Sequence, residues 1–298
     1  MKSKNIDSEI RREFSLLQKN HPKVKHDWMA NYRSFSKQCE SKARAEAAST
    51  LEPWISLLEI CIQWLAHLHI ALFEGSIKYS KKYRHKIFVP CVLTGTACVQ
   101  ARSILTLVSC GFDSPARSIL RTLIETLSIC IVTAHNDELC RKYYKSRNFK
   151  KSNELWYREF SRGKLQNLLH QVELTSGFPN DVSNAMRKWF KEESSVYSQT
   201  IHTSYISAFL TAFPIDKYNN YEPRKGVFGC NTGFSHRTLS QATMFIWYFS
   251  RIGYNSILDT TKYKGELVKS LTGKNKNGAA VVFGREVLSK LTLKYWSA

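Results

Sequence analysis

Apolar residues recur at intervals of three and four along residues 54–72, which read "WISLLEICIQWLAHLHIAL". This is the period of an α-helix, and Pro53 suits the first turn of such a helix. The residues that set the period are Trp54, Leu57, Leu58, Cys61, Trp64, Leu65, Leu68 and Leu72. Similar patterns predict helices over 90–110, 115–135, 164–174, 180–192, 194–212 and 236–258. Because strand patterns are scarce, the sequence predicts an all-α protein, a helical bundle.

Composition divides the predicted bundle into three segments. Residues 1–50 form a charged helical N-terminal arm, 51–258 the α-helical core domain, and 259–298 a small basic C-terminal appendage. A length of 298 residues with 43% hydrophobic content supports a sizeable core. In the appendage, the run "KNKNG" is typical of a turn, so we consider a β-hairpin there. The stretch 214–234 is rich in Pro, Gly and Asn and predicts a long loop.

Charge is the composition feature that bears most directly on function. The chain has 44 lysines and arginines against 24 acids, a net charge of +20. This excess indicates a polyanionic partner, either nucleic acid, which we favour, or an anionic membrane surface. A basic protein kept soluble by its charge, or a basic face that docks on an acidic protein, would give the same composition.

Cysteine usage and the apolar segments indicate the compartment. The eight cysteines contain no CxxC pair and read as reduced thiols, so we expect a cytoplasmic protein with no metal site and no cofactor. No secretory signal is visible near Met1. The apolar segments 54–73, 87–112 and 119–134 are each interrupted by charged or His residues. We therefore expect no membrane span.

Four charged residues interrupt the apolar stretch "DSPARSILRTLIETLSICIV". Asp113, Arg117, Arg121 and Glu125 are spaced by four, which places them on one stripe of a helix. Arg121 and Glu125 have apolar neighbours on almost every side. Either they form a buried ion pair that serves the fold, or they line an anion-binding or catalytic pocket.

A second polar cluster lies in "YSQTIHTSYIS". Its His202 is either a hydrogen-bonded core residue or a general acid or base that meets Arg121 and Glu125 across the bundle. These three residues would supply metal-independent RNA cleavage, and are our candidate catalytic residues. Arg117 and Tyr205 are the candidate anion-binding residues beside them.

Basic segments supply candidate contacts to nucleic acid. The run "CRKYYKSRNFKK" interleaves cations with aromatic residues, as expected where phosphates are neutralised and bases are stacked. A solvated helix face with aromatic anchors to the core is the alternative. The candidates, with those of two further clusters, are Lys81, Lys82, Arg84, Arg141, Lys142, Tyr144, Lys145, Arg147, Lys150, Lys274 and Lys276.

The central stretch resembles an uncharacterised bacterial domain-of-unknown-function family of helical proteins. The pattern Gly-aromatic-x3-Ala-x3-Leu-Arg-x3-Glu is carried here by Gly111, Phe112, Ala116, Leu120, Arg121 and Glu125. A later Ser-x3-His segment corresponds to Ser198 and His202, and the resemblance extends in patches over 85–258. It implies an α-helical fold and directs attention to Arg121, Glu125 and His202.

The chain is also similar, more weakly, to HEPN ribonucleases of prokaryotic toxin and antiviral systems. Those enzymes place an Arg and a His about four residues apart on one helix of a dimer. This chain departs from that pattern, because no Arg-x4-His occurs and the spacing from Lys164 to His170 is one residue too long. An analogous site would need an Arg and a His from different helices.

We therefore predict a nucleic-acid-binding helical protein, an effector or recognition component of a bacterial antiviral defence or toxin system that carries a candidate ribonuclease site. The defence context rests on resemblance alone. The alternatives are a non-catalytic adaptor for an acidic protein partner and a bundle that senses a nucleotide on Arg117 and Arg121. Besides nucleic acid, we expect a second copy of the chain in a homodimer, or a protein partner within a multi-component system.

Overall fold

The computed structural model describes residues 6–23, 28–78, 83–177, 179–201, 205–213, 227–230, 233–258, 271 and 276–296. Within these ranges every regular element is a helix, which confirms the all-α prediction. The helices are α1 (Ile6–Asn20), α2 (Trp28–Thr50), α3 (Trp54–Lys78), α4 (Arg84–Ser109), α5 (Asp113–His135), α6 (Asp137–Lys145), α7 (Phe149–Leu155), the π-helix η1 (Trp156–Phe160), α8 (Lys164–Thr175), α9 (Asn180–Ile201), α10 (Tyr205–Ala212), α12 (Gly233–Leu258) and α14 (Lys276–Trp296).

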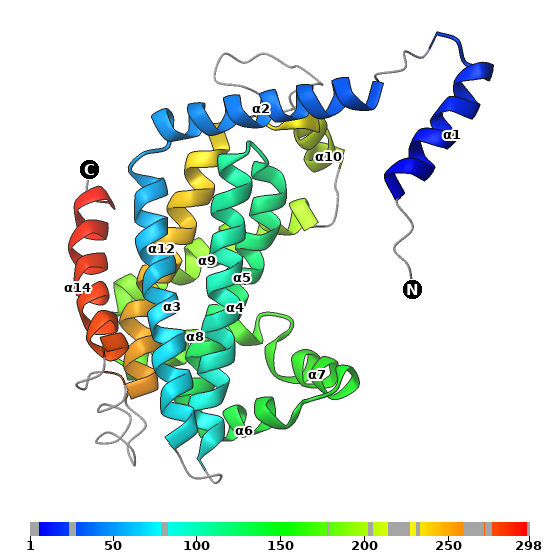
Figure 1. The fold of residues 1–298 in the computed structure, drawn as a ribbon. Helices are drawn as coiled ribbons and strands as arrows, with labels where there is room; N and C mark the ends of the chain where they lie inside the picture. Colours follow the sequence, from blue (N-terminus) through cyan, green and yellow to red (C-terminus); the bar gives the residue numbers. More distant parts are fainter. Residues whose placement is uncertain are drawn as a thin grey trace.

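The core lies among four long helices, α3, α4, α5 and α12, which run side by side (Figure 1). Their shared interior is filled by large apolar side chains such as Trp64, Phe245 and Phe249, each almost fully buried. On the outside of this group, α14 packs against α3 and α12. The indole Nε1 of Trp64 donates a hydrogen bond to the carbonyl oxygen of Val281 at 3.0 Å, which attaches α14 to α3.

A tight turn joins α4 to α5 and requires glycine. Gly111 has a φ of +81°, and a Cβ there would approach the backbone nitrogen of Cys230 to 2.3 Å. That nitrogen instead donates a hydrogen bond to the Gly111 carbonyl oxygen at 2.9 Å. The close contact between the two backbones explains why Gly111, the first residue of the pattern noted in the sequence, stands here.

The start of α5 differs from the predicted helix 115–135, which would place Ser114 at the N-cap. The helix begins at Asp113 with Phe112 as its N-cap residue, and no side chain caps it. The Ser114 hydroxyl instead lies 2.7 Å from that of Thr211 in α10. A tertiary contact has thus replaced the local cap. The predicted end is confirmed, because Asn136 ends α5 and its side chain accepts a hydrogen bond from the Leu139 amide at the start of α6.

The C-terminal segment corrects the hairpin prediction. From Lys276 onward the tail is the helix α14, and residues 274–275 of the expected turn lie outside the described residues. Val281 and Leu288 are seven residues apart and both fully buried, so they share one face of the helix. The apolar residues of this tail follow a helical period, which outweighs the local turn propensity of "KNKNG".

Two other boundaries differ from the predictions. The chain does not break near residue 193, because α9 continues to Ile201. Most of the expected loop at 214–234 lies outside the described residues, but α12 already begins at Gly233. In the arm, α1 and α2 are helical as predicted, and α2 packs against α4. The division at residues 50 and 258 stays a prediction.

Three helices are long and apolar enough to cross a membrane by length and composition: Trp54–Ile77, Arg84–Ser109 and Asp113–His135. Within the bundle, 44%, 39% and 56% of their most apolar windows are buried. These are the helices whose apolar residues build the core. The expectations that the protein is cytoplasmic and does not enter a membrane stay predictions.

Candidate functional site

The first two members of the charged stripe on α5 pair with each other. Arg117 Nε lies 3.0 Å from Asp113 Oδ2, and the Asp113 side chain is only 2% exposed. Asp113 also accepts a hydrogen bond from the hydroxyl of Thr238 in α12 at 2.5 Å. Burial raises the pKa of Asp113, while the Arg117 charge and these hydrogen bonds oppose that rise. Arg117 further lies over the ring of Phe234, with Cζ 5.2 Å from its centroid.

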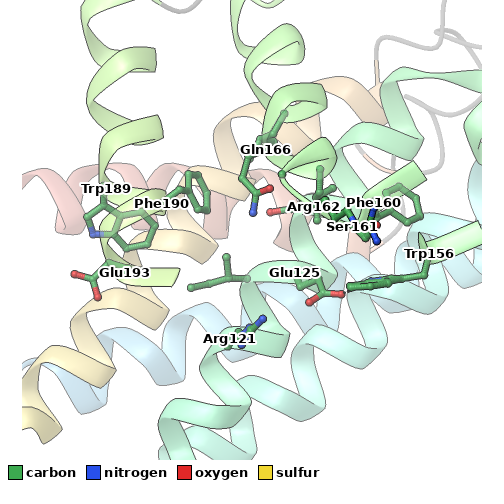
Figure 2. A pocket seen from close by; sticks show the side chains of 15 residues that line it. Arg121, Glu125, Trp156, Phe160, Ser161, Arg162, Gln166, Trp189, Phe190 and Glu193 are labelled. Carbon is green, nitrogen blue, oxygen red and sulfur yellow. Dashed lines mark hydrogen bonds between the residues drawn. The ribbon is translucent and has the colours of Figure 1, made fainter. Parts of the chain in front are cut away.

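The next two members do not pair. Within the described residues neither Arg121 nor Glu125 forms an ion pair, and the buried Nη1 of Arg121 has no hydrogen-bond partner. Both side chains line a cavity of about 280 Å³ (Figure 2). The lining residues are Arg121, Ile124, Glu125, Ser128, Trp156, Phe160, Ser161, Arg162, Gly163, Leu165, Gln166, Leu169, Trp189, Phe190 and Glu193. The cavity therefore lies between α5 and the segment from η1 to α9.

Aromatic side chains form much of the wall of this cavity. Trp156 of η1 donates a hydrogen bond from Nε1 to Oε1 of Glu125 at 2.7 Å, which fixes the carboxylate beside the indole (Figure 2). On the opposite wall, Trp189 of α9 stacks on Phe245 of the core with a centroid distance of 6.4 Å. Both indoles are thus anchored to the bundle and present aromatic surface to the cavity.

The segment from η1 to α8 supplies backbone groups to the cavity. Arg162 has a φ of 55° and Gly163 one of 80°, so the chain turns sharply after the π-helix and α8 begins at Lys164. Gly163, Leu165 and Gln166 line the cavity, and α8 has no side-chain cap. The first turn of a helix presents amide hydrogens that favour a negative charge. This end of the cavity is therefore suited to an anion.

One acid in the cavity wall is already neutralised. Glu193 is 94% buried, and its Oε1 accepts a short hydrogen bond from Arg237 of α12. Its second oxygen, Oε2, has no partner among the described residues. The cations of the lining are Arg121 and Arg162. Its second acid, Glu125, forms no ion pair within the described residues.

The structure separates the predicted site residues. Arg121 and Glu125 share the cavity, whereas Arg117 is paired with Asp113 and does not line it. Tyr205, in α10, is 83% exposed and stacks on Phe209. It does not line the cavity either. His202, the third candidate catalytic residue, lies outside the described residues.

Residues 87–192 match a known family model. The family is described as a family of unknown function (DUF5677). The matched segment runs from α4 into α9 and contains every residue of the cavity lining except Glu193. No curated protein and no solved structure matches the chain. An uncharacterised domain family is therefore the resemblance that the comparisons support, and the similarity to HEPN ribonucleases stays a prediction.

The sequence analysis missed the wall that faces Arg121. Gln166 and Trp189 lie in segments predicted only as helices, and neither Trp156 nor Arg162 was singled out as a candidate residue. A signal was present in "WYREFSRGK", where three aromatic residues are followed by an Arg-Gly turn and the start of a helix. Such a turn places polar groups at a helix N-terminus, but the sequence does not show which helix faces them.

The basic segment around α6 is partly neutralised by acids. Asp137 accepts hydrogen bonds from Arg141 at 2.8 Å and His85 at 2.8 Å, and its ion pair with Lys86 spans 3.1 Å. Burial alone would raise the pKa of Asp137, but these three partners outweigh it and lower the pKa to about 2. Lys142 pairs with Glu138 at 2.8 Å. His85 and Lys86 thus join α4 to α6 through Asp137, whereas Arg141 and Lys142 pair within α6.

Other cations of that segment form no ion pair among the described residues. Lys145 and Lys150 are exposed, and Arg147 lies over the ring of Tyr144 at 4.5 Å. Arg84 is partly buried and Lys276 is exposed. Lys81, Lys82 and Lys274 lie outside the described residues. Among those residues no group of His, Cys, Asp and Glu could hold a metal ion.

Proposed function

We propose that the protein binds a nucleotide unit in the cavity beside Arg121, with the phosphate on Arg121 and the base between the tryptophans. The observation that carries this proposal is the buried Nη1 of Arg121, which has no hydrogen-bond partner within the described residues. A buried donor without a partner costs about 1–3 kcal/mol, and more when it is charged. A bound anion would remove that penalty.

The chemistry of the cavity favours a phosphate attached to an aromatic ring. The planar guanidinium of Arg121 matches the oxygens of a phosphate in a bidentate arrangement. Trp156 and Trp189 offer faces for stacking, and Glu125 and Gln166 offer hydrogen-bond groups for the edge of a base. A volume of about 280 Å³ suits one nucleotide better than a longer ligand.

The nucleotide could be free or part of a single-stranded RNA, and the charge of the chain favours RNA. The net charge of +20 attracts a polyanion. The unpaired Lys145 and Lys150 precede η1 in the chain, and η1 forms one wall of the cavity. A strand bound along this basic segment could insert one unstacked base into the cavity.

Quenching of tryptophan fluorescence tests the binding proposal, because two tryptophans line the cavity. Wild type is titrated with a mononucleotide and, separately, with a short single-stranded RNA. Arg121→Gln removes the charge, and Arg102→Gln, an exposed cation of α4 outside the cavity, is the control. We expect Arg121→Gln to weaken binding about 10-fold or more, because a hydrogen bond to a charged group contributes about 1.5–3 kcal/mol.

The two ligands distinguish the two sources of the nucleotide. Tight binding of RNA with weak binding of the mononucleotide indicates a strand partner, and the reverse indicates a free nucleotide. Binding of neither ligand, or an equal loss in Arg121→Gln and Arg102→Gln, contradicts the proposal. If the affinity for RNA does not fall as the salt concentration rises, the protein does not bind RNA through its phosphates.

Cleavage is a separate proposal and needs its own assay. It requires His202 to act as general acid or base near Arg121 and Glu125. Labelled RNA is incubated with wild type, His202→Ala and Arg121→Ala. If wild type cuts and both variants do not, the ribonuclease prediction is supported. If wild type leaves the RNA intact, or if His202→Ala cuts equally well, the prediction fails while binding can still hold. The antiviral context, the acidic protein partner and the homodimer stay predictions.

A further inference from the structure

A second cavity, of about 380 Å³, lies between α12 and α14. Arg251, Tyr254 and Leu258 follow one another at helical spacing on α12 and face it. The residues that α14 contributes also recur at three and four, and they are Val282, Arg285, Glu286, Ser289 and Lys290. Two polar stripes on neighbouring helices therefore enclose this space, far along the chain from the residues of the first cavity.

Three cations of this cavity have no acid partner in the described part of the chain. Arg251, Arg285 and Lys290 line it together with the acid Glu286, but none of them forms an ion pair with it or with another carboxylate there. The lining thus has three positive charges and one negative charge, a net charge of +2. A cavity with this balance attracts a doubly charged anion.

Hydrogen bonds to neutral groups hold the two arginines in place. Arg285 donates from Nε to the carbonyl oxygen of Ser250 at 2.9 Å and from Nη2 to Asn255 Oδ1 at 3.0 Å. Arg251 donates from Nη1 to the hydroxyl of Ser289 at 3.1 Å. Burial lowers the pKa of Arg285, and the nearby charge of Arg251 lowers it further. Two like charges are therefore kept close together by neutral partners.

Tyr254 provides an independent observation. The residue is only 2% exposed, and its hydroxyl has no hydrogen-bond partner among the described residues. Its ring lies under Arg285, with Cζ 5.0 Å from the centroid. A buried tyrosine hydroxyl normally finds a partner. Tyr254 is one of the residues that line a cavity with three cations, so an oxygen of a bound anion can accept a hydrogen bond from its hydroxyl.

We propose that the cavity between α12 and α14 binds a phosphate group through Arg251, Arg285, Lys290 and the Tyr254 hydroxyl. Phosphate fits better than a carboxylate because it can carry two negative charges and offers oxygens to several donors at once. The phosphate belongs either to a small phosphorylated molecule or to the backbone of a nucleic acid. This site is independent of the cavity at Arg121.

Calorimetric titration with inorganic pyrophosphate tests the site, in a buffer free of phosphate and sulfate. The full chain carries Arg121→Gln, so that the first cavity does not contribute. In this background we compare Tyr254→Phe, Arg251→Gln and Lys290→Gln with Lys276→Gln, a cation of α14 outside the cavity. We expect the first three to weaken binding about 10-fold each, and the control to change it less than about 2-fold.

Tyr254→Phe is the decisive variant, because it removes only a hydroxyl that has no hydrogen-bond partner within the described residues. Its melting temperature should equal or exceed that of its parent, whereas its affinity falls. A second titration with a short single-stranded RNA distinguishes the sources. Loss of RNA affinity in the same variants assigns the site to a nucleic-acid backbone, and loss for pyrophosphate alone assigns it to a small molecule. Binding of neither probe, or equal weakening by Lys276→Gln, overturns the proposal.

Discussion

The two halves of the charged stripe on α5 each contain one acid and one arginine four residues apart, but they make different contacts. Asp113 and Arg117 pair at 3.0 Å, and Thr238 and Phe234 of α12 complete their surroundings. Arg121 and Glu125 have the same spacing, yet within the described residues they form no ion pair: Glu125 accepts a hydrogen bond from Trp156, and the buried Nη1 of Arg121 has no hydrogen-bond partner. Spacing alone therefore does not decide whether a charge pair forms.

What separates the two halves is the element that packs on each. The start of α5 faces α12, which supplies a hydroxyl to Asp113 and an aromatic ring to Arg117, and neither of these two residues lines the cavity at Arg121. The middle of α5 faces η1, α8 and α9, whose side chains enclose a space. The first half stabilises the fold, and the second leaves a charge available to a ligand. The following substitutions test this division.

Arg117→Ala should have the largest effect on stability. It leaves the nearly fully buried Asp113 carboxylate without its cation, and breaking a buried pair from one side costs about 3–5 kcal/mol. Because burial already raises the pKa of Asp113 and Arg117 opposes that rise, the variant raises this pKa further. The folded state then favours a protonated Asp113, so the deficit is greatest at pH 7 and shrinks as the pH falls through the raised pKa. Urea denaturation at several pH values measures it.

The matched control is Arg44→Ala in α2. Arg44 pairs with Glu40 at 2.9 Å and at the same spacing of four, but both side chains are about half exposed. An exposed pair contributes about 0.2–1 kcal/mol, so this substitution should cost little. If both substitutions lower the free energy of unfolding equally, burial does not determine how much the Asp113–Arg117 pair contributes to stability.

Asp137→Asn should have an intermediate effect, since it removes a carboxylate that binds His85 and two cations, Lys86 and Arg141. The pKa of Asp137 is lowered to about 2 from an ordinary value of 3.8, so its contribution to stability is present above about pH 4 and is lost as the pH falls toward 2. The side chain is 36% exposed, which reduces the contribution to about 1–2 kcal/mol. Denaturation of wild type and variant should differ at pH 7 and converge near pH 2. A constant difference over that range would mean that the carboxylate acts through packing alone.

The sequence predicted the helices better than it predicted the site. The helical period of apolar residues predicted α3, α4 and α5, because it repeats over several turns in each of them. It did not predict α14, because "KNKNG" was interpreted as a turn. The sequence also indicated that Arg121 and Glu125 either pair with each other or line a pocket. Which of the two happens depends on Trp156, which lies 31 residues beyond Glu125 in the chain and binds its carboxylate. No local pattern encodes that contact, because it depends on how η1 packs against α5.

Arg121→Ala should have the smallest effect on stability and gives the sharpest contrast with Arg117→Ala. Within the described residues Arg121 has no carboxylate partner to leave unpaired, and its removal also eliminates a buried donor without a partner. The free energy of unfolding should therefore change by less than about 0.5 kcal/mol or increase slightly, while binding at the cavity is lost. Denaturation and ligand titration on the same preparation measure both. If Arg121→Ala lowers the free energy of unfolding as much as Arg117→Ala does, Arg121 stabilises the fold. A residue whose charge only binds a ligand contributes nothing to stability when the ligand is absent.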